Sequence, residues 1–306
     1  MAKAEDIKQR DREIYDAIAE SYDARMAQYN ARFAADLIDL LCPQKGEAAL
    51  DLAGGTGAAG LRLAERIGPE GKVTIVDISA KCLDKASYNA ALKRLANIET
   101  RVMDAEALDI PDASCDIVVS CFGIQYVPDV PKALSEVYRV LKPGGRIGLV
   151  VWSVPERFPF GCEPMSAFMD FMAPASVRAL LKVPWLGRKI RRRLLLARSP
   201  LGYSPCRFSK PGSLEKLLNQ AGFTSVRRDL RAFPLEFASF EEYWDTVMMF
   251  VPAGRKAELP STVVDQVWER VRARLAHPRT GSVLLFNEAA FLLASKPLDH
   301  LQDSAS

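Results

Sequence analysis

One stretch, residues 48–60 with the sequence AALDLAGGTGAAG, limits the fold more than any other part of the chain. An apolar run ends at Asp51, a glycine-rich turn follows, and a helical pattern runs from Leu61 to Ile67. Glycines in such a turn let the backbone bend sharply and approach a ligand where a Cβ would clash. The stretch therefore predicts a nucleotide-binding site. Residues 55–60 also fit the dinucleotide pattern G-x-G-x-x-G, so the rest of the sequence must decide which nucleotide is bound.

Strands and helices alternate along the chain up to Trp152. The apolar runs lack polar alternation and are spaced by helical patterns, which is typical of a parallel sheet buried on both faces. The alternation breaks over 154–208 and resumes from Ser213. The expected strands are 48–52, 72–77, 98–103, 116–121, 146–152 and 226–237, with a strand or hairpin at 282–295. The expected helices are 5–29 (one helix or two), 32–41, 59–67, 80–95, 130–141, 213–221, 240–250 and 261–275.

Composition narrows the class of protein. With 49% hydrophobic residues, 26% charged residues and a net charge of +3, the chain is typical of a globular protein and does not indicate nucleic-acid binding by the whole molecule. No apolar run approaches the roughly 20 residues that span a bilayer, and the polar residues 1–12 predict no signal peptide. Six scattered cysteines indicate reduced thiols and match no metal-ligand spacing. We expect a cytoplasmic protein without a metal site.

Polar residues follow the ends of the predicted strands. Asp77 ends the second strand, where a carboxylate can accept hydrogen bonds from both hydroxyls of a ribose. Asp104 and Ala105 follow the third strand, beside the expected place of an adenine, and Cys121 ends the fourth. Because the carboxyl ends of parallel strands meet at one crevice, we expect these side chains to share a pocket.

Four motifs, LDLAGGTG, VDIS, MDAEALDIPDASCDIVVSCFG and YRVLKPGGRI, stand in this order along the chain. In order and spacing they resemble those of class I S-adenosylmethionine-dependent methyltransferases, in particular the ubiquinone/menaquinone C-methyltransferase branch (methyltransferase type 11) and its small-molecule relatives. The resemblance is strong over residues 12–153 and looser beyond. It implies an α/β, Rossmann-like, mostly parallel sheet of seven strands with helices on both faces. It also implies the strand order 3-2-1-4-5-7-6, with the last strand antiparallel.

The same resemblance implies S-adenosylmethionine as cofactor and S-adenosylhomocysteine as product. The glycine turn would lie along the methionine part, Asp77 at the ribose and Asp104 at the adenine. The segment YDAIAESYD is similar to a helix that closes over the cofactor, which makes Tyr22 a candidate lid residue. The residues implied to contact the cofactor are Tyr22, Asp51, Gly55, Thr56, Gly57, Asp77, Asp104, Ala105 and Cys121.

Two positions depart from the family pattern. Ala53 stands where the family often has its first glycine, although AGGTG also occurs in the quinone branch. Gln125 and Tyr126 stand where the quinone enzymes have a basic-polar pair. The dinucleotide alternative explains the glycine turn and Asp77 but leaves DAEALDIPD and the LKPGG turn without a role, so it is disfavoured.

In methyl transfer the cofactor, rather than the protein, supplies the reactive group. The sulfonium of the cofactor supplies a strongly electrophilic methyl group, so the protein must align a nucleophile and exclude water. A base is needed only if the nucleophile arrives protonated. His277 is the candidate base, with Glu163, Asp170 and Tyr126 as weaker alternatives, whereas His300 lies in the tail.

We expect a single domain over 1–306. Its parts would be a helical cap (1–45), a cofactor-binding core (46–153), a lid and acceptor-binding insertion (154–208) and the remaining strands and helices (209–297). The basic cluster Arg188–Arg193 is either a solvated helix face or a surface for an anionic substrate or membrane. Apolar side chains of the insertion either line the acceptor pocket or form its own core: Trp152, Phe158, Phe160, Phe168, Met169 and Met172.

The favoured function is methyl transfer to oxygen, carbon or nitrogen of a small organic acceptor, such as a hydroxylated aromatic or another specialised metabolite. The first alternative is C-methylation of a lipophilic quinone precursor at the membrane surface, with peripheral contact through Arg188–Arg193. The second alternative is a non-catalytic regulatory protein that binds S-adenosylmethionine. Methylation of RNA or protein is disfavoured because no broad basic face is evident, so no nucleic-acid partner is expected.

Overall fold

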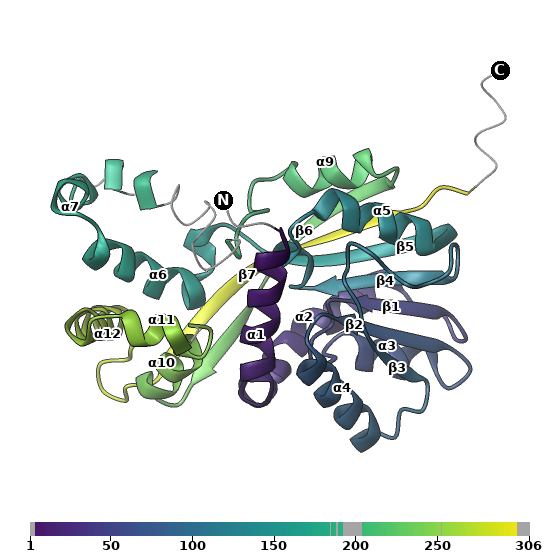
Figure 1. Ribbon diagram of the computed structural model, residues 1–306, viewed down its shortest axis with the longest axis horizontal. Coiled ribbons are helices and arrows are strands. Elements are labelled where there is room, and N and C mark those ends of the chain that lie inside the picture. The colour runs from purple at the N-terminus through teal and green to yellow at the C-terminus, as the bar shows by residue number, and fades with distance from the viewer. Residues whose placement is uncertain (1–3, 184, 188, 192–203, 252, 299–306) are drawn as a thin grey trace. The chain divides into compact units, whose positions relative to one another are not determined.

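The computed structural model describes residues 4–183, 185–187, 189–191, 204–251 and 253–298 (Figure 1). Arg188, Arg192, Arg193 and His300 lie outside the described residues. The chain forms two compact units: the first comprises 1–151, 210–231 and 290–306, and the second comprises 152–209 and 232–289. The domain boundaries expected from the sequence stay predictions.

The seven expected strands form one sheet in the order β3-β2-β1-β4-β5-β7-β6, as predicted. Strands β1 to β5 pair in parallel. Strand β7 is antiparallel to β5. Gly144 N–H donates to Lys296 O and Ser153 N–H donates to Glu288 O, so residue numbers increase along β5 as those of the paired residues decrease. The strands are β1 (Ala48–Leu52), β2 (Lys72–Asp77), β3 (Ile98–Val102), β4 (Cys115–Cys121), β5 (Leu141–Trp152), β6 (Thr224–Phe237) and β7 (Val283–Ser295).

Helices form at each predicted place, but the structure departs from the prediction at the N-terminus and adds helices at Pro159–Met172, Ala175–Leu181 and Ala253–Glu258. The sequence predicted a break between residues 29 and 32, but the chain stays helical from Ala4 to Leu41, with a π-helical segment at Asp23–Ala27. No glycine or proline interrupts this stretch, and Cys42 ends it in the left-handed conformation, just before Pro43. The helices are α1 (Ala4–Tyr22), α2 (Gln28–Leu41), α3 (Gly60–Ile67), α4 (Ala80–Leu92), α5 (Val130–Val140), α6 (Pro159–Met172), α7 (Ala175–Leu181), α9 (Ser213–Gln220), α10 (Phe240–Met248), the unpredicted α11 (Ala253–Glu258) and α12 (Ser261–Leu275).

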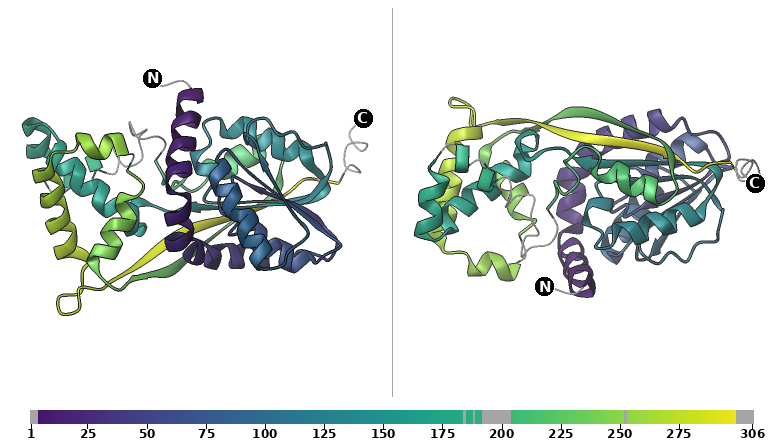
Figure 2. Two further views of the ribbon diagram at one scale, coloured as in Figure 1. Left: turned by 60° about the horizontal axis from the view of Figure 1, so that its bottom comes forward. Right: turned by 90° about the horizontal axis from the view of Figure 1, so that it is seen from above.

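Within the first unit, two groups of helices cover the sheet (Figure 2). Helices α2, α3 and α4 contact one another in sequence, and α5 contacts α9. The apolar face of α2 shows why it packs there: Phe33, Leu37 and Ile38 recur at helical spacing and are fully buried. The central strands β1 and β4 are buried on both faces, as expected for a parallel sheet.

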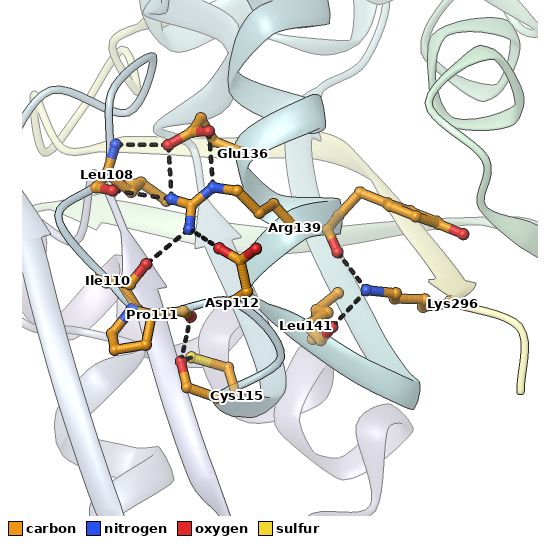
Figure 3. A network of polar contacts seen from close by, with 11 residues as sticks. Leu108, Ile110, Pro111, Asp112, Cys115, Glu136, Arg139, Leu141 and Lys296 are labelled. Carbon is orange, nitrogen blue, oxygen red and sulfur yellow. Dashed lines mark hydrogen bonds and ion pairs between the residues drawn. The ribbon is translucent and has the colours of Figure 1, made fainter. Parts of the chain in front are cut away.

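A network around Arg139 holds the loop that follows β3 (Figure 3). The guanidinium of Arg139, on α5, donates to Leu108 O (2.8 Å), Ile110 O (2.8 Å) and the Asp112 carboxylate (2.6 Å). Glu136, one turn earlier, bonds the same guanidinium and accepts from Leu108 N–H at 2.8 Å. The arginine of the YRVLKPGG motif therefore fixes the loop whose beginning carries Asp104.

The second unit has an aromatic core. Trp152 stacks on Phe158 at 4.2 Å between ring centroids, and Phe160 contacts the rings of Phe237 and Tyr243. Trp152, Phe158 and Phe160 are buried here and belong to the unit's own core, whereas Met172 is 53% exposed. Among the described residues no helix is both long and apolar enough to cross a bilayer.

Candidate functional site

The carboxyl ends of β1, β2, β3 and β4 open into one pocket of the first unit, where open parallel sheets bind ligands. The N-terminal helix and the π-helical segment add aromatic, acidic and basic side chains to its wall. The residues that line it are Lys8, Asp11, Tyr15, Tyr22, Asn30, Asp51, Ala53, Gly54, Gly55, Thr56, Ala58, Ala59, Asp77, Ile78, Cys82, Met103, Asp104, Ala105, Cys121, Phe122, Gly123, Tyr126, Val127 and Pro128.

The Asp51 carboxylate lies at the base of the glycine turn. It is fully buried, and its Oδ2 accepts from Gly60 N–H at 2.7 Å. A Cβ on Gly54 would come within 2.7 Å of the Asp51 carboxylate, so only glycine fits beside it. Burial raises the pKa of Asp51 to about 7, although the Gly60 hydrogen bond acts against this rise.

The backbone at the strand ends is strained where it meets the pocket. Ala53 after β1 and Phe122 after β4 both adopt left-handed conformations, with φ of 52° and 62°. Such conformations are costly for residues with a Cβ and cluster at ligand-binding sites. The φ of Ala53 also explains the glycine that the family often has at this position.

Asp77 at the end of β2 is held by the turn that it faces. Its Oδ2 accepts from Gly55 N–H and its Oδ1 from Ser79 N–H, both at 2.9 Å. Each oxygen keeps a second lone pair, so the carboxylate can still accept two hydroxyl groups. Burial raises the pKa of Asp77, and the backbone hydrogen bonds oppose the rise.

Asp104 beyond β3 is tied to the N-terminal helix. Its Oδ2 lies 2.6 Å from Lys8 Nζ, which also contacts Glu106 at 2.7 Å and Glu5 at 3.2 Å. Lys8 is only 7% exposed. Desolvation lowers its pKa, but the hydrogen bonds to Asp104 and Glu106 more than offset this and the pKa is raised. Lys8 therefore carries its charge at the pocket wall.

Three tyrosines and one asparagine form the side of the pocket contributed mainly by helices. Tyr15 lies edge-on to Tyr22 and to Tyr126, with ring centroids 6.0 and 6.5 Å apart. Burial raises the pKa of Tyr15 and Tyr22, so both phenols stay protonated at neutral pH. Asn30 Nδ2 donates to the Tyr22 hydroxyl at 2.8 Å.

Helix α1 is fastened to α4 and to the β2 turn. Asp16 accepts from Ser79 Oγ at 2.6 Å, and Arg12 Nε donates to Ile78 O at 3.2 Å. Farther along, Asn89 donates to Asp23 at 2.9 Å. These bonds hold Tyr15 and Tyr22 in place as part of the pocket wall.

The structure brings together eight of the ten predicted site residues. Gly57 does not line the pocket. A Cβ there would lie 3.2–3.3 Å from Leu61 and Ala86, and the backbone has a φ of +91°, so glycine is needed for close helix packing and for this backbone conformation. His277 lies on an exposed turn of the second unit, where its Nδ1 is 3.1 Å from Thr280 Oγ1. The residues that line the pocket as predicted are Tyr22, Asp51, Gly55, Thr56, Asp77, Asp104, Ala105 and Cys121.

Sequence reasoning missed Lys8, Tyr15 and Asn30 as pocket residues. Tyr15 belongs to the YDAIAESYD segment and was open to prediction at helical spacing from Tyr22. Lys8 and Asn30 carry no such signal. The partner of Lys8, Asp104, lies 96 residues away along the chain, and the position of Asn30 at the pocket depends on the register of the helix.

The predicted basic cluster is described only in part. Within Arg188–Arg193, Lys189 is exposed, whereas Arg191 forms a two-point ion pair with Asp170 at 2.7 and 2.9 Å. Asp170 also contacts Arg270 at 2.7 Å. Arg191 therefore serves an internal ion pair of the second unit.

Comparison with known proteins decides the family. The sequence model of the ubiE/COQ5 methyltransferase family matches residues 2–233, three quarters of the chain. The chain belongs to this family. The matched region includes every strand end that lines the pocket and stops within β6, so residues 234–306 lie beyond it.

Two curated relatives show where the similarity concentrates. The chain is 47% identical over 113 residues to the ubiquinone/menaquinone biosynthesis C-methyltransferase UbiE of Brucella anthropi, covering 36% of this chain and 43% of that protein. It is 31% identical over 200 residues to the demethylmenaquinone methyltransferase of Listeria monocytogenes, covering 64% and 78%. The chain thus spans about half the length of the first relatives that it matches.

A solved structure supports the fold. The YcgJ protein of Bacillus subtilis superposes with a TM-score of 0.57 at 18% sequence identity, over 87% of this chain and 98% of that chain. At this identity the likeness concerns the fold alone.

Proposed function

We propose that this chain is an S-adenosylmethionine-dependent methyltransferase that acts on a small organic acceptor. The observation that carries the proposal is the first unit's pocket, where three carboxylates, those of Asp51, Asp77 and Asp104, stand at the ends of adjacent strands. Membership of a methyltransferase family supports the same reaction.

The residues present fit this cofactor. The Asp77 carboxylate has lone pairs left for the two hydroxyls of a ribose, and Asp104 stands beyond the neighbouring strand. At Gly55 a side chain would project into open space beside the pocket, so the turn leaves room for a ligand. Asp51 adds a buried carboxyl group on the side of the glycine turn.

The bound cofactor would supply an electrophilic methyl group. The chain's part is to hold the reactants in line and to keep water out, which together account for much of the acceleration in such reactions. Tyr15, Tyr22 and Tyr126 suit this part, because their rings contact one another at the pocket wall. The pocket-lining thiol of Cys121 stays protonated, since burial raises its pKa well above the ordinary value.

A second candidate acceptor is a lipophilic quinone precursor. The names of the curated relatives favour it, since they are quinone and menaquinone methyltransferases. The second unit also exposes Trp185 (65%), with the exposed Lys182 and Lys189 close to it in the sequence, a combination that suits the surface of an anionic bilayer. Part of the second unit, residues 234–289, lies beyond the family match, so the acceptor is the least transferable part of the assignment.

Calorimetric titration with S-adenosylhomocysteine tests the cofactor assignment. We expect micromolar binding that weakens by about 100-fold in Asp77→Ala, the loss expected when two hydrogen bonds to a buried carboxylate disappear. Absence of binding, together with affinity for a nicotinamide dinucleotide, would overturn the proposal.

Turnover of the cofactor with panels of phenols and of demethylated quinones then separates the two acceptor classes. Cofactor binding without turnover on either panel would favour the regulatory alternative. A cytoplasmic location stays a prediction.

A further inference from the structure

Two buried oxygen atoms in the first unit's pocket have no hydrogen-bond partner among the described residues. One is Asp51 Oδ1, on a fully buried side chain whose other oxygen is bonded to Gly60 N–H. The other is Asn30 Oδ1, on a side chain that is 6% exposed and whose amide nitrogen donates to Tyr22. Buried polar atoms are nearly always paired in folded proteins, so two unpaired acceptors in one pocket point to a ligand that donates hydrogen bonds.

The chemistry of the two atoms narrows the ligand group. Asn30 Oδ1 is an acceptor only, and so is Asp51 Oδ1 once the carboxyl group is ionised above about pH 7. A carboxylate, a phosphate or an ether oxygen cannot then satisfy them. Asp51 contributes a negative charge where water is scarce, and a cationic donor gains most from such a charge. An ammonium group has three N–H donors and one positive charge, so it offers enough donors for both acceptors.

We propose that Asn30, together with Asp51, binds the α-ammonium group of the methionine part of S-adenosylmethionine. This inference rests on the proposed function. Asp77 and Asp104 are assigned to the ribose and the adenine. The amino-acid arm of the cofactor, whose ammonium group donates hydrogen bonds, still needs acceptors. Asn30 supplies a second acceptor without adding a further negative charge beside Asp51 and Asp77.

The π-helical segment explains how Asn30 reaches the pocket. In a regular α-helix, residues eight apart differ by about 80° around the axis, because each residue turns by about 100°. Tyr22 and Asn30 are eight apart, yet both line the pocket and bond each other at 2.8 Å. The wider turn at Asp23–Ala27 lies between them and takes up this rotation.

Titration of paired variants with paired ligands tests the inference. The ligands are S-adenosylhomocysteine and 5′-methylthioadenosine, which has the same nucleoside but lacks the amino-acid arm. We expect Asn30→Ala to weaken S-adenosylhomocysteine binding by about tenfold and to change 5′-methylthioadenosine binding by less than about twofold, because only the arm carries the ammonium group. Asp77→Ala is the matched control and should weaken both ligands alike.

Asn30→Asp sharpens the result, because it keeps an acceptor and adds a negative charge. It should bind S-adenosylhomocysteine at least as tightly as wild type near pH 8. A large loss in Asn30→Asp would overturn the inference, since it would mean that the side chain presents its N–H to an anionic group. Equal losses of both ligands in Asn30→Ala, with thermal unfolding showing a folded variant, would also overturn it. If wild type binds neither ligand, it is the proposed function that fails.

Discussion

The two units differ in the polar side chains that they bury and in how these are paired. The first buries charged and amide groups around its pocket, among them Asp51, Glu106, Lys8 and Asn30. The second buries rings: Phe160, Phe240 and Tyr243 contact further aromatic side chains within the same unit. Its buried amide, Asn287, is paired, because its Oδ1 accepts from Phe160 N–H at 3.1 Å.

This difference separates binding from packing. In the described part of the second unit no buried side-chain nitrogen or oxygen lacks a partner, so its buried polar side chains are paired within the protein. In the first unit, Asp51 and Asn30 each keep an unused acceptor at the pocket, which costs stability unless a ligand pairs with it. The aromatic core thus stabilises the second unit, whereas the unpaired acceptors at the pocket lower the stability of the ligand-free first unit and are available to a ligand.

The largest effect is expected from truncating the aromatic core. Phe240 is fully buried and lies edge-on to Trp268 at 5.2 Å. Phe240→Ala should lower the free energy of unfolding by about 3–5 kcal/mol in urea titrations, because it leaves a cavity. Phe286→Ala is the matched control, since Phe286 is 59% exposed, and it should cost less than about 1 kcal/mol. Equal losses would mean that the ring cluster does not carry the stability of this unit.

A smaller loss is expected from the buried ion pairs of the first unit. Lys8→Met should lower the free energy of unfolding by about 2–4 kcal/mol, because it strips the buried Glu106 of its cation. The matched control is Lys81→Met, whose only nearby carboxylate, among the contacts of the described residues, is the exposed Asp84 at 3.9 Å. A loss no larger than that of the control would show that α1 is held by other contacts.

Asp51→Asn is expected to stabilise the protein. Burial raises the pKa of Asp51 from 3.8 to about 7, so the native state retains a proton that the unfolded chain releases. Ionisation of Asp51 therefore opposes folding, fully above pH 7 and less as the pH falls toward 4. We expect the variant to be more stable by about 1–3 kcal/mol at pH 8, with a gap that narrows at pH 5. A gap that does not depend on pH would contradict the raised pKa. The same variant should bind S-adenosylhomocysteine more weakly.

The smallest effect is expected at His277. Its Nδ1 accepts from Arg279 N–H and Thr280 N–H at 3.4 and 3.3 Å, so the ring serves the local turn. His277→Ala should change both turnover and stability little, the latter by less than about 0.5 kcal/mol. A loss of turnover by 100-fold or more with unchanged cofactor affinity would instead establish His277 as the base.

The sequence predicted the sheet because its signals are local. Each apolar strand, the glycine turn and the acidic residues at the ends of the first three strands can be read from short stretches of sequence, and the strand order follows from the family resemblance. For the same reason Asp51, Asp77 and Asp104 were placed correctly at one pocket. Gly57, also expected there, is not among the lining residues. The sequence could not show this, because a glycine that frees the backbone for a ligand and one that makes room for a helix look alike in sequence.

Only the tertiary structure brought Lys8 and Asn30 to the pocket. Lys8 meets Asp104 across 96 residues of sequence, and no periodicity encodes that contact. Asn30 faces the pocket because five residues of π-helix change the register of an otherwise regular helix. The sequence by itself thus determined where the strands end and which acids stand there. Which side chains close the pocket was decided by packing and helix register, since these depend on contacts between distant segments.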